Sequence, residues 1–243
     1  MNSGYYAAVT GLVARLQAFE VAANNVANLS TPGYKGQREF YSLLTSGDNE
    51  FDFPLQRAVN NFAVLGGASV DLREGSLDHT DNPLDLAVEG PGFLEIETPA
   101  GTRYTRNGNF SLSATGQLIT QKGNPVMGEQ GPIDIPAGAA SVSPDGTISV
   151  GGAVVARLRL VEFPAGTQLI PEGGSNFSVP AGVGREAVQS HLRQGALEAS
   201  NVNPAAGAIA LMTLQRHIET LQRALTIFHT EFNRTAVEDL SRV

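Results

Sequence analysis

The sequence predicts an α+β protein with a long helix near each end of the chain and an all-β domain of short antiparallel strands inserted between them. Two observations support this prediction. Near both termini, apolar residues recur at alternating spacings of three and four, which is typical of amphipathic helices. Between these segments the sequence changes to short alternating runs separated by glycine-containing dipeptides, which is the pattern of strands and turns.

The N-terminal helix is indicated by an apolar stripe that continues for three heptads, with no proline before Pro32. The stripe consists of Tyr5, Val9, Leu12, Leu16, Phe19, Ala23 and Val26.

The C-terminal helix is indicated by a second stripe with the same alternation and by a start signal. Asn203 suits the N-cap position, and Pro204 suits the first helical position. The stripe consists of Leu211, Leu214, Ile218, Leu221, Leu225, Phe228 and Phe232.

Both stripes are narrow, and each large apolar side chain gains roughly 1.5–3 kcal/mol when it is buried. We therefore expect the first and last helices to pair as a coiled coil, with residues 1–30 and 200–243 forming one discontinuous domain. The remaining apolar surface is then available as an assembly interface to neighbouring molecules. The alternative is two ordinary amphipathic helices on a globular core, because periods of 3.5 and 3.6 are hard to separate over three heptads.

The first helix ends in an unusual corner. Asn24, Asn25 and Asn28 cluster where the last carbonyl groups of a helix lack partners, and Thr31-Pro32-Gly33-Tyr34 then predicts a type II turn. One interpretation is that the asparagines only cap the helix locally. The other adds amide contacts to neighbouring subunits that fix their register, as a buried asparagine does in a coiled coil.

The segment 31–70 is expected to connect the helix to the β-rich domain, with some helical signal at residues 39–44. Residues 71–199 are expected to form that domain. Turn dipeptides punctuate it, and Asn107-Gly108 is the strongest hairpin signal among them. Residues 153–163 continue the strand pattern. The other turn dipeptides are Ala100-Gly101, Thr115-Gly116, Lys122-Gly123 and Asp145-Gly146.

Composition excludes several classes of protein. The net charge is −8 and the cations are scattered, so neither nucleic acid nor a membrane surface is an expected partner. No apolar run approaches 18 residues, and we expect no membrane insertion. Cysteine is absent, which excludes disulfides and thiolate chemistry. The N-terminus lacks the parts of a secretory signal peptide, so we expect none to be cleaved.

The sequence contains no catalytic constellation, and we expect no enzyme activity, cofactor, metal or small-molecule substrate. The four histidines lack the spacing of metal ligands. Gly182–Ala187 fits the letters of a dinucleotide loop, but no strand–helix unit surrounds it. Arg103 and Arg106 could bind an anion, but we expect them to be exposed strand residues that serve solubility or a protein interface.

Four segments, in order along the chain, resemble the bacterial flagellar rod and hook protein family. The segments are VAANNVANLSTPGYK (21–35), NPLDLAVEGPGFLEI (82–96), YTRNGNFSLSATGQLITQKGNPVMG (104–128) and GALEASNVNPAAGAIALM (195–212). The chain length is similar to that of the rod proteins with a single β domain. Among these it most resembles a proximal-rod subunit, with a distal-rod or hook-type subunit as the alternative.

The resemblance implies a structural subunit of the basal-body rod, the drive shaft that crosses the periplasm and transmits torque. It implies export through the flagellar type III apparatus without cleavage, and assembly with copies of itself and with adjacent rod proteins. The helices would form an inner tube, and the β-rich domain an outer layer. An alternative from another class is a β binding module that its coiled coil oligomerises, but such a stalk needs only one helical stripe.

Overall fold

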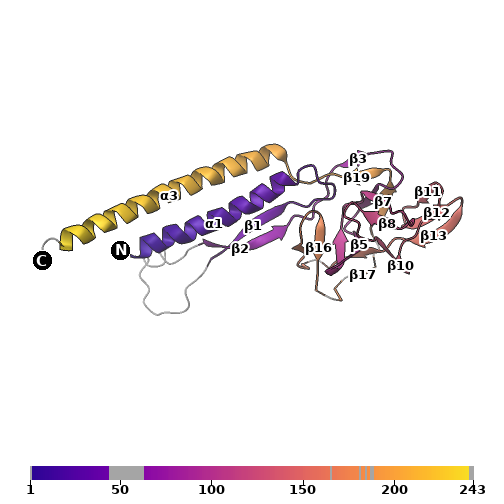
Figure 1. Cartoon of the computed structure of the whole chain (residues 1–243), viewed down its shortest axis with the longest axis horizontal. Helices are drawn as coiled ribbons and strands as arrows, with labels where there is room; N and C mark the ends of the chain where they lie inside the picture. Colours follow the sequence, from indigo (N-terminus) through magenta and orange to yellow (C-terminus); the bar gives the residue numbers. More distant parts are fainter. Residues whose placement is uncertain are drawn as a thin grey trace. The chain divides into compact units, whose positions relative to one another are not determined.

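The computed structural model describes residues 2–43, 63–164, 166–180, 182–183, 185–186 and 189–240 (Figure 1). The chain forms two compact units. The helical unit contains Met1–Val26, Gln37–Ser69 and Asn203–Val243, and the β unit contains Ala27–Gly36 and Val70–Val202. Each unit is therefore built from segments that are distant in the sequence.

The helical unit contains the two predicted helices, which are confirmed. Helix α1 spans Asn2–Ala27, and helix α3 spans Pro204–Leu240. The start of α3 follows its sequence signal, because the Ala206 N–H donates to Asn203 Oδ1 at 3.0 Å. Asn203 thus accepts from the third residue of the helix, as an N-cap residue does.

The two helices pack against each other in antiparallel orientation (Figure 1). Ala18 and Ala22 of α1 are buried against Leu214. Further along, a Cβ added to Gly11 would lie 4.0 Å from Leu221 Cδ1. Residues nearer the N-terminus of α1 thus contact residues nearer the C-terminus of α3, as antiparallel packing requires. The coiled-coil geometry itself stays a prediction.

The helix contact buries small residues of α1 together with members of both predicted stripes. Ala14, Ala18 and Ala22 are buried on α1, whereas Leu16 is 43 % exposed. Small side chains let two helix backbones approach closely, and Leu214 from α3 fills the space between them. Phe19 packs at the side of this contact.

The helical unit also contains a two-stranded sheet of β1 (Gln37–Leu43) and β2 (Ala63–Val70). The helical signal at residues 39–44 is therefore wrong for residues 39–43, and Leu44 lies outside the described residues. Phe40 and Tyr41 are residue types that favour strands, and pairing with β2 outweighs the weak helical pattern.

The β unit consists of short strands whose recorded pairs are all antiparallel, as the sequence predicts. Its largest sheet has the order β15-β16-β6-β5-β14-β17, and β11-β12-β13 form a second sheet. The strands are β3 (Leu77–His79), β4 (Leu86–Glu89), β5 (Phe93–Thr98), β6 (Gly101–Thr105), β7 (Phe110–Leu112), β8 (Leu118–Thr120), β9 (Met127–Gly128), β10 (Gly131–Pro132), β11 (Ala140–Val142), β12 (Thr147–Val150), β13 (Ala153–Arg157), β14 (Leu160–Glu162), β15 (Ile170–Pro171), β16 (Asn176–Ser178), β17 (Arg185–Glu186), β18 (His191–Gln194) and β19 (Ala196–Glu198).

The main core of the β unit lies among its sheets. It gathers buried residues from β4, β5, β7, β8, β12, β14 and β18, including Leu94, Ile96 and Ile148, which are fully buried. A smaller cluster contains Phe93, Leu169 and Phe177. Two of the polar residues described below lie at strand ends, because Arg106 directly follows β6 and Glu198 ends β19.

Four of the five turn predictions in the β unit are confirmed, and one is wrong. Ala100-Gly101 joins the paired strands β5 and β6, and Lys122-Gly123 lies in a turn in which the Gly123 N–H donates to the carbonyl of Thr120 at 2.9 Å. Thr115-Gly116 joins the paired strands β7 and β8, and Asp145-Gly146 joins β11 and β12. Asn107-Gly108 does not form a hairpin, because β6 and β7 belong to different sheets. A Cβ at Gly108 would lie 1.7 Å from the carbonyl oxygen of Leu86, so glycine is needed there for a close backbone approach.

The strand pattern at 153–163 is divided between two strands. Its first half forms β13 beside β12, and its second half forms β14 beside β5. One continuous pattern therefore serves two sheets, with Leu158 buried between them in the core.

Candidate functional site

The segment after α1 forms a hydrogen-bonded turn. The Tyr34 N–H donates to the carbonyl of Thr31 at 3.2 Å, and Gly33 has a φ of 65°. A positive φ at the third position is what a type II turn requires. A Cβ on Gly33 would lie 2.3 Å from the carbonyl carbon of Arg106. The turn is thus packed directly against the backbone that follows β6.

Two of the asparagines at the corner make local hydrogen bonds. Asn25 binds both backbone groups of Gln37, because its Nδ2 donates to the carbonyl and its Oδ1 accepts from the N–H, each at 2.8 Å. Asn28 Oδ1 accepts from the Thr31 hydroxyl at 3.1 Å. Asn25 therefore fixes the chain where β1 begins, and Asn28 fixes the turn. Contacts of these amides with neighbouring subunits stay a prediction.

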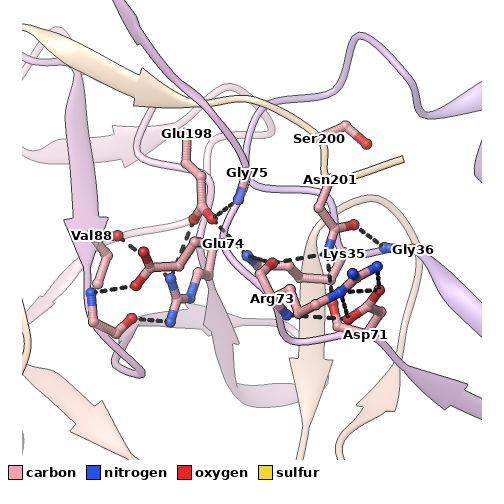
Figure 2. Close-up of polar contacts among 12 residues, drawn as sticks. Lys35, Gly36, Asp71, Arg73, Glu74, Gly75, Val88, Glu198, Ser200 and Asn201 are labelled. Carbon is pink, nitrogen blue, oxygen red and sulfur yellow. Dashed lines mark hydrogen bonds and ion pairs between the residues drawn. The ribbon is translucent and has the colours of Figure 1, made fainter. Parts of the chain in front are cut away.

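A buried ion pair lies directly beyond the turn. Lys35 Nζ is 2.6 Å from Glu198 Oε1, and each side chain is only 1 % exposed (Figure 2). The same ammonium donates to the carbonyl of Arg73 at 2.7 Å, and Glu198 Oε1 accepts from the Gly75 N–H at 2.9 Å. The pair is thus hydrogen-bonded on both sides, which a buried ion pair needs to be tolerated.

Arg106 adds a second cation to Glu198. Its Nη1 lies 3.4 Å from Glu198 Oε2 and also donates to the carbonyl of Val88 at 3.4 Å. Its Nη2 donates to the carbonyl of Gly90, and its guanidinium carbon lies 5.0 Å from the centre of the Phe93 ring. Arg106 is 2 % exposed, so the expectation of an exposed strand arginine is wrong. Its positive charge faces the Glu198 carboxylate inside the β unit.

Asn201 completes the cluster with a single side-chain amide (Figure 2). Its Oδ1 accepts from the Gly36 N–H at 2.8 Å. Its Nδ2 donates to the carbonyls of Asp71 and Arg73, each at 2.8 Å. Its backbone N–H points to the carbonyl of Tyr34 at 3.4 Å. We call Lys35, Arg106, Glu198 and Asn201 with these partners the polar clasp.

The electrostatics of the polar clasp are dominated by burial. Burial lowers the pKa of Lys35, while the charge of Glu198 and the hydrogen bond to it oppose this change. Burial also raises the pKa of the neighbouring Tyr34. Because the carboxylate faces two cations and a backbone N–H, its negative charge is compensated within the cluster. This arrangement holds chain segments together and leaves no group poised for chemistry.

The predicted assembly residues occupy several environments. On α3, Leu214 is buried, whereas Phe228 is 48 % exposed. On α1, Leu16 is exposed and Phe19 packs against the helix contact. The side chains of Tyr5 and Phe232 lie outside the described residues. The half-buried members are Val9, Leu12, Val26, Leu211, Ile218, Leu221 and Leu225.

Among the described residues, His, Asp and Glu side chains form no group of three or more that could hold a metal ion. In the same part of the chain, no helix is long and apolar enough to cross a membrane.

Three family models match separate parts of the chain. Residues 6–35 match the flagella basal body rod protein, residues 87–150 the flagellar hook protein FlgE/F/G D1 domain, and residues 193–230 the flagellar basal body rod FlgEFG protein C-terminal region. Full-length relatives extend this likeness. The flagellar basal-body rod protein FlgF of Escherichia coli is 33 % identical, over 93 % of this chain and 94 % of its own length.

The chain belongs to the flagellar basal-body rod protein family. FlgF of Mesorhizobium japonicum is 31 % identical over 90 % of each chain, and FlgG of Caulobacter vibrioides is 32 % identical over 90 % of this chain and 92 % of its own length. The family is structural, so the chain is a structural protein of the flagellar basal body and is not an enzyme.

The polar clasp draws on all three regions that match the family. Lys35 ends the first region, Arg106 lies in the second, and Glu198 and Asn201 lie in the third. Sequence reasoning identified the turn and named Arg106 as a residue that could bind an anion, but it missed the cluster that these four residues form. One signal was available, because Lys35 is one of only two lysines in the chain and directly follows the turn.

Proposed function

We propose that this chain assembles with copies of itself and with adjacent rod proteins into the helical shaft that crosses the periplasm and transmits torque. The observation that carries the proposal is the apolar surface that α3 keeps after it has paired with α1. Ile209, Met212 and Ile227 are 65 %, 62 % and 63 % exposed, and Phe228 is 48 % exposed. Contacts with neighbouring subunits along α3 would cover these side chains.

The helices supply the inner layer of this assembly. We assign residues 1–30 and 200–243 to the inner tube, with both apolar stripes as subunit contacts, and residues 71–199 to the outer layer. The antiparallel contact through Ala18 and Leu214 supports this assignment, since it turns one side of each helix inward and leaves the other available. Export through the flagellar type III apparatus without cleavage follows from the same family resemblance.

Within the rod we assign the chain to the proximal part. FlgF proteins stand among its relatives at 31–33 % identity, with both chains covered over nine tenths of their length. FlgG of Agrobacterium fabrum reaches 33 % identity, so a distal position is the alternative. The tagged chain in purified basal bodies, located by electron microscopy, decides between the two positions.

The assembly proposal is tested by Phe228→Asp, which places a charge on the exposed stripe. Because Phe228 is half exposed in the single chain, the monomer is expected to fold normally. The variant should not enter basal bodies, and motility should be lost. The matched variant is Gln222→Asp, which adds the same charge at an exposed polar position of α3 and should assemble normally. Normal motility with Phe228→Asp contradicts the proposed interface.

A further inference from the structure

The polar clasp gathers the places where the chain passes between its two units. The chain changes unit after residues 26, 36, 69 and 202. Gly36, Asp71 and Asn201 lie within two residues of the last three of these points. All three belong to the clasp, because Asn201 binds Gly36 and Asp71 through one side chain. Three of the four passages are thus tied together inside the β unit.

We propose that the polar clasp is a force-transmitting junction, which makes the β unit hold these three passages as one rigid piece. The inference rests on the proposed function, because only a torque-carrying shaft loads the passages. If the three segments were separate, each would twist and slide alone under torsion. Bonded to one another, they must move together, and the load is shared among several hydrogen bonds.

Asn201 is the central positioning residue of this junction. Its side chain accepts a hydrogen bond from Gly36 and donates hydrogen bonds to Asp71 and Arg73, and so it joins two of the three segments (Figure 2). Asn201 itself lies on the third segment, which leads into α3. A backbone bond adds to the link, because the Asp71 N–H donates to the carbonyl of Gly36 at 2.7 Å. Gly36 and Asp71 are therefore held to each other directly and also through Asn201.

The ion pair of Lys35 and Glu198 strengthens the same junction from inside. Lys35 precedes the passage at Gly36, and Glu198 lies on β19, shortly before the passage at residue 202. Separating these side chains would take the buried Lys35 ammonium away from the carboxylate that it faces, which is strongly unfavourable. Packing is equally close, because a Cβ on Gly75 would lie 2.0 Å from the carbonyl oxygen of Ala199. These segments have little room to slide.

The test replaces Asn201 by aspartate in the full chain. Asn201→Asp keeps the size and the acceptor for Gly36 but turns an oxygen toward the carbonyls of Asp71 and Arg73, which then repel it. In the purified chain, amide exchange at Gly36 and Asp71 should accelerate by about tenfold or more, since both bonds open locally. The matched variant is Ile148→Val, which weakens the core of the β unit without touching the clasp. Leu118→Ala serves if a larger loss of thermal stability must be matched.

The decisive measurement is swimming speed against medium viscosity in cells that carry each variant. We expect Asn201→Asp to enter basal bodies in normal number and to lose speed selectively as viscosity rises, whereas the matched core variant follows the wild type. Equal curves for the two variants overturn the proposal. If Asn201→Asp does not assemble, the swimming speed of cells that carry Asn201→Ala is measured against viscosity instead. If neither variant assembles, the proposal of a force-transmitting junction is also overturned. Absence of the wild-type chain from basal bodies refutes the proposed function itself, which is a separate result.

Discussion

Lys35 and Glu198, which are 163 residues apart in the sequence, form an ion pair that is almost completely excluded from solvent. One residue follows the turn after α1, and the other ends β19, the last strand before α3. The pair thus joins the beginning and the end of the β unit. Because Arg106 also faces Glu198, the carboxylate balances two buried cations, and the partners in the pair are not equivalent.

The first prediction compares the loss of Glu198, which faces two cations, with the loss of Lys35. Glu198→Gln removes the carboxylate that both Lys35 and Arg106 face, and removing one partner of a buried pair costs about 3–5 kcal/mol. Lys35→Met leaves Glu198 with Arg106 and the Gly75 N–H, so its effect on the free energy of unfolding should be smaller. Urea unfolding of the purified chain, followed by circular dichroism, measures both.

The order of these two effects is the informative result. If Lys35→Met destabilises the chain as much as Glu198→Gln, then Arg106 does not compensate the carboxylate as its position implies. Arg223→Met is a suitable comparison, because its ion pair with Glu219 is exposed on α3 and should contribute little.

A second prediction concerns the turn. Gly33 and Gly123 both have positive φ, but a Cβ at Gly33 meets the backbone of Arg106, and a Cβ at Gly123 meets nothing within 4 Å. Gly123→Ala should cost about 1–2 kcal/mol from the backbone conformation alone. Gly33→Ala should cost about 1–3 kcal/mol more, as overpacking does. Thermal unfolding of both variants measures the difference, and equal losses would show that the turn can move away from Arg106.

A third prediction is a loss of stability in alkali that depends on Tyr34. Burial raises the pKa of its hydroxyl above the ordinary 10.0. Between 10.0 and the raised pKa, the folded chain keeps a proton that the unfolded chain has released. The contribution is therefore complete below pH 10 and decreases as the pH rises through the pKa of the folded state. Tyr34→Phe should lose less stability than the wild type above pH 10 in urea unfolding. Parallel curves for the two proteins contradict this prediction.

Features with a local cause could be predicted from the sequence. Asn203 caps α3 through a bond to Ala206, three residues away, and Thr115-Gly116 turns between strands that are adjacent in the sequence. In each case the residues that form the structure are neighbours in the chain. The two helices and the antiparallel strands of the β unit depend on similar local patterns, and they were predicted correctly.

Features that depend on distant contacts could not be predicted in the same way. Asn107-Gly108 has the letters of a hairpin, but Gly108 is needed because Leu86 approaches its backbone. Arg106 has the pattern of an exposed strand residue, but Glu198, 92 positions later, draws it inside. The polar clasp was missed for the same reason, because each of its members bonds to a segment far along the chain.

The helix contact shows a third situation, in which members of the predicted stripes pack together with small residues that the pattern did not include. Large apolar residues define a stripe, and the sequence analysis assigned the contact to them. Ala18 and Ala22, which lie outside the stripe, are buried in the contact beside Leu214, whereas Leu16 of the stripe is exposed. The exposed stripe residues, such as Leu16 and Phe228, remain available for the contacts between subunits that we propose.

This distinction gives the last prediction. Ala18 is fully buried against Leu214, so Ala18→Leu forces extra volume between α1 and α3 and should cost about 1–3 kcal/mol. Val13 lies on the same helix with 49 % of its surface exposed, so Val13→Leu adds a methylene without filling any contact. Thermal melting of the dilute full chain, followed by circular dichroism at 222 nm, should show earlier loss of helix for Ala18→Leu and no change for Val13→Leu. If both variants melt like the wild type, the helices do not pack closely through Ala18, and the large residues of the stripe make the contact instead.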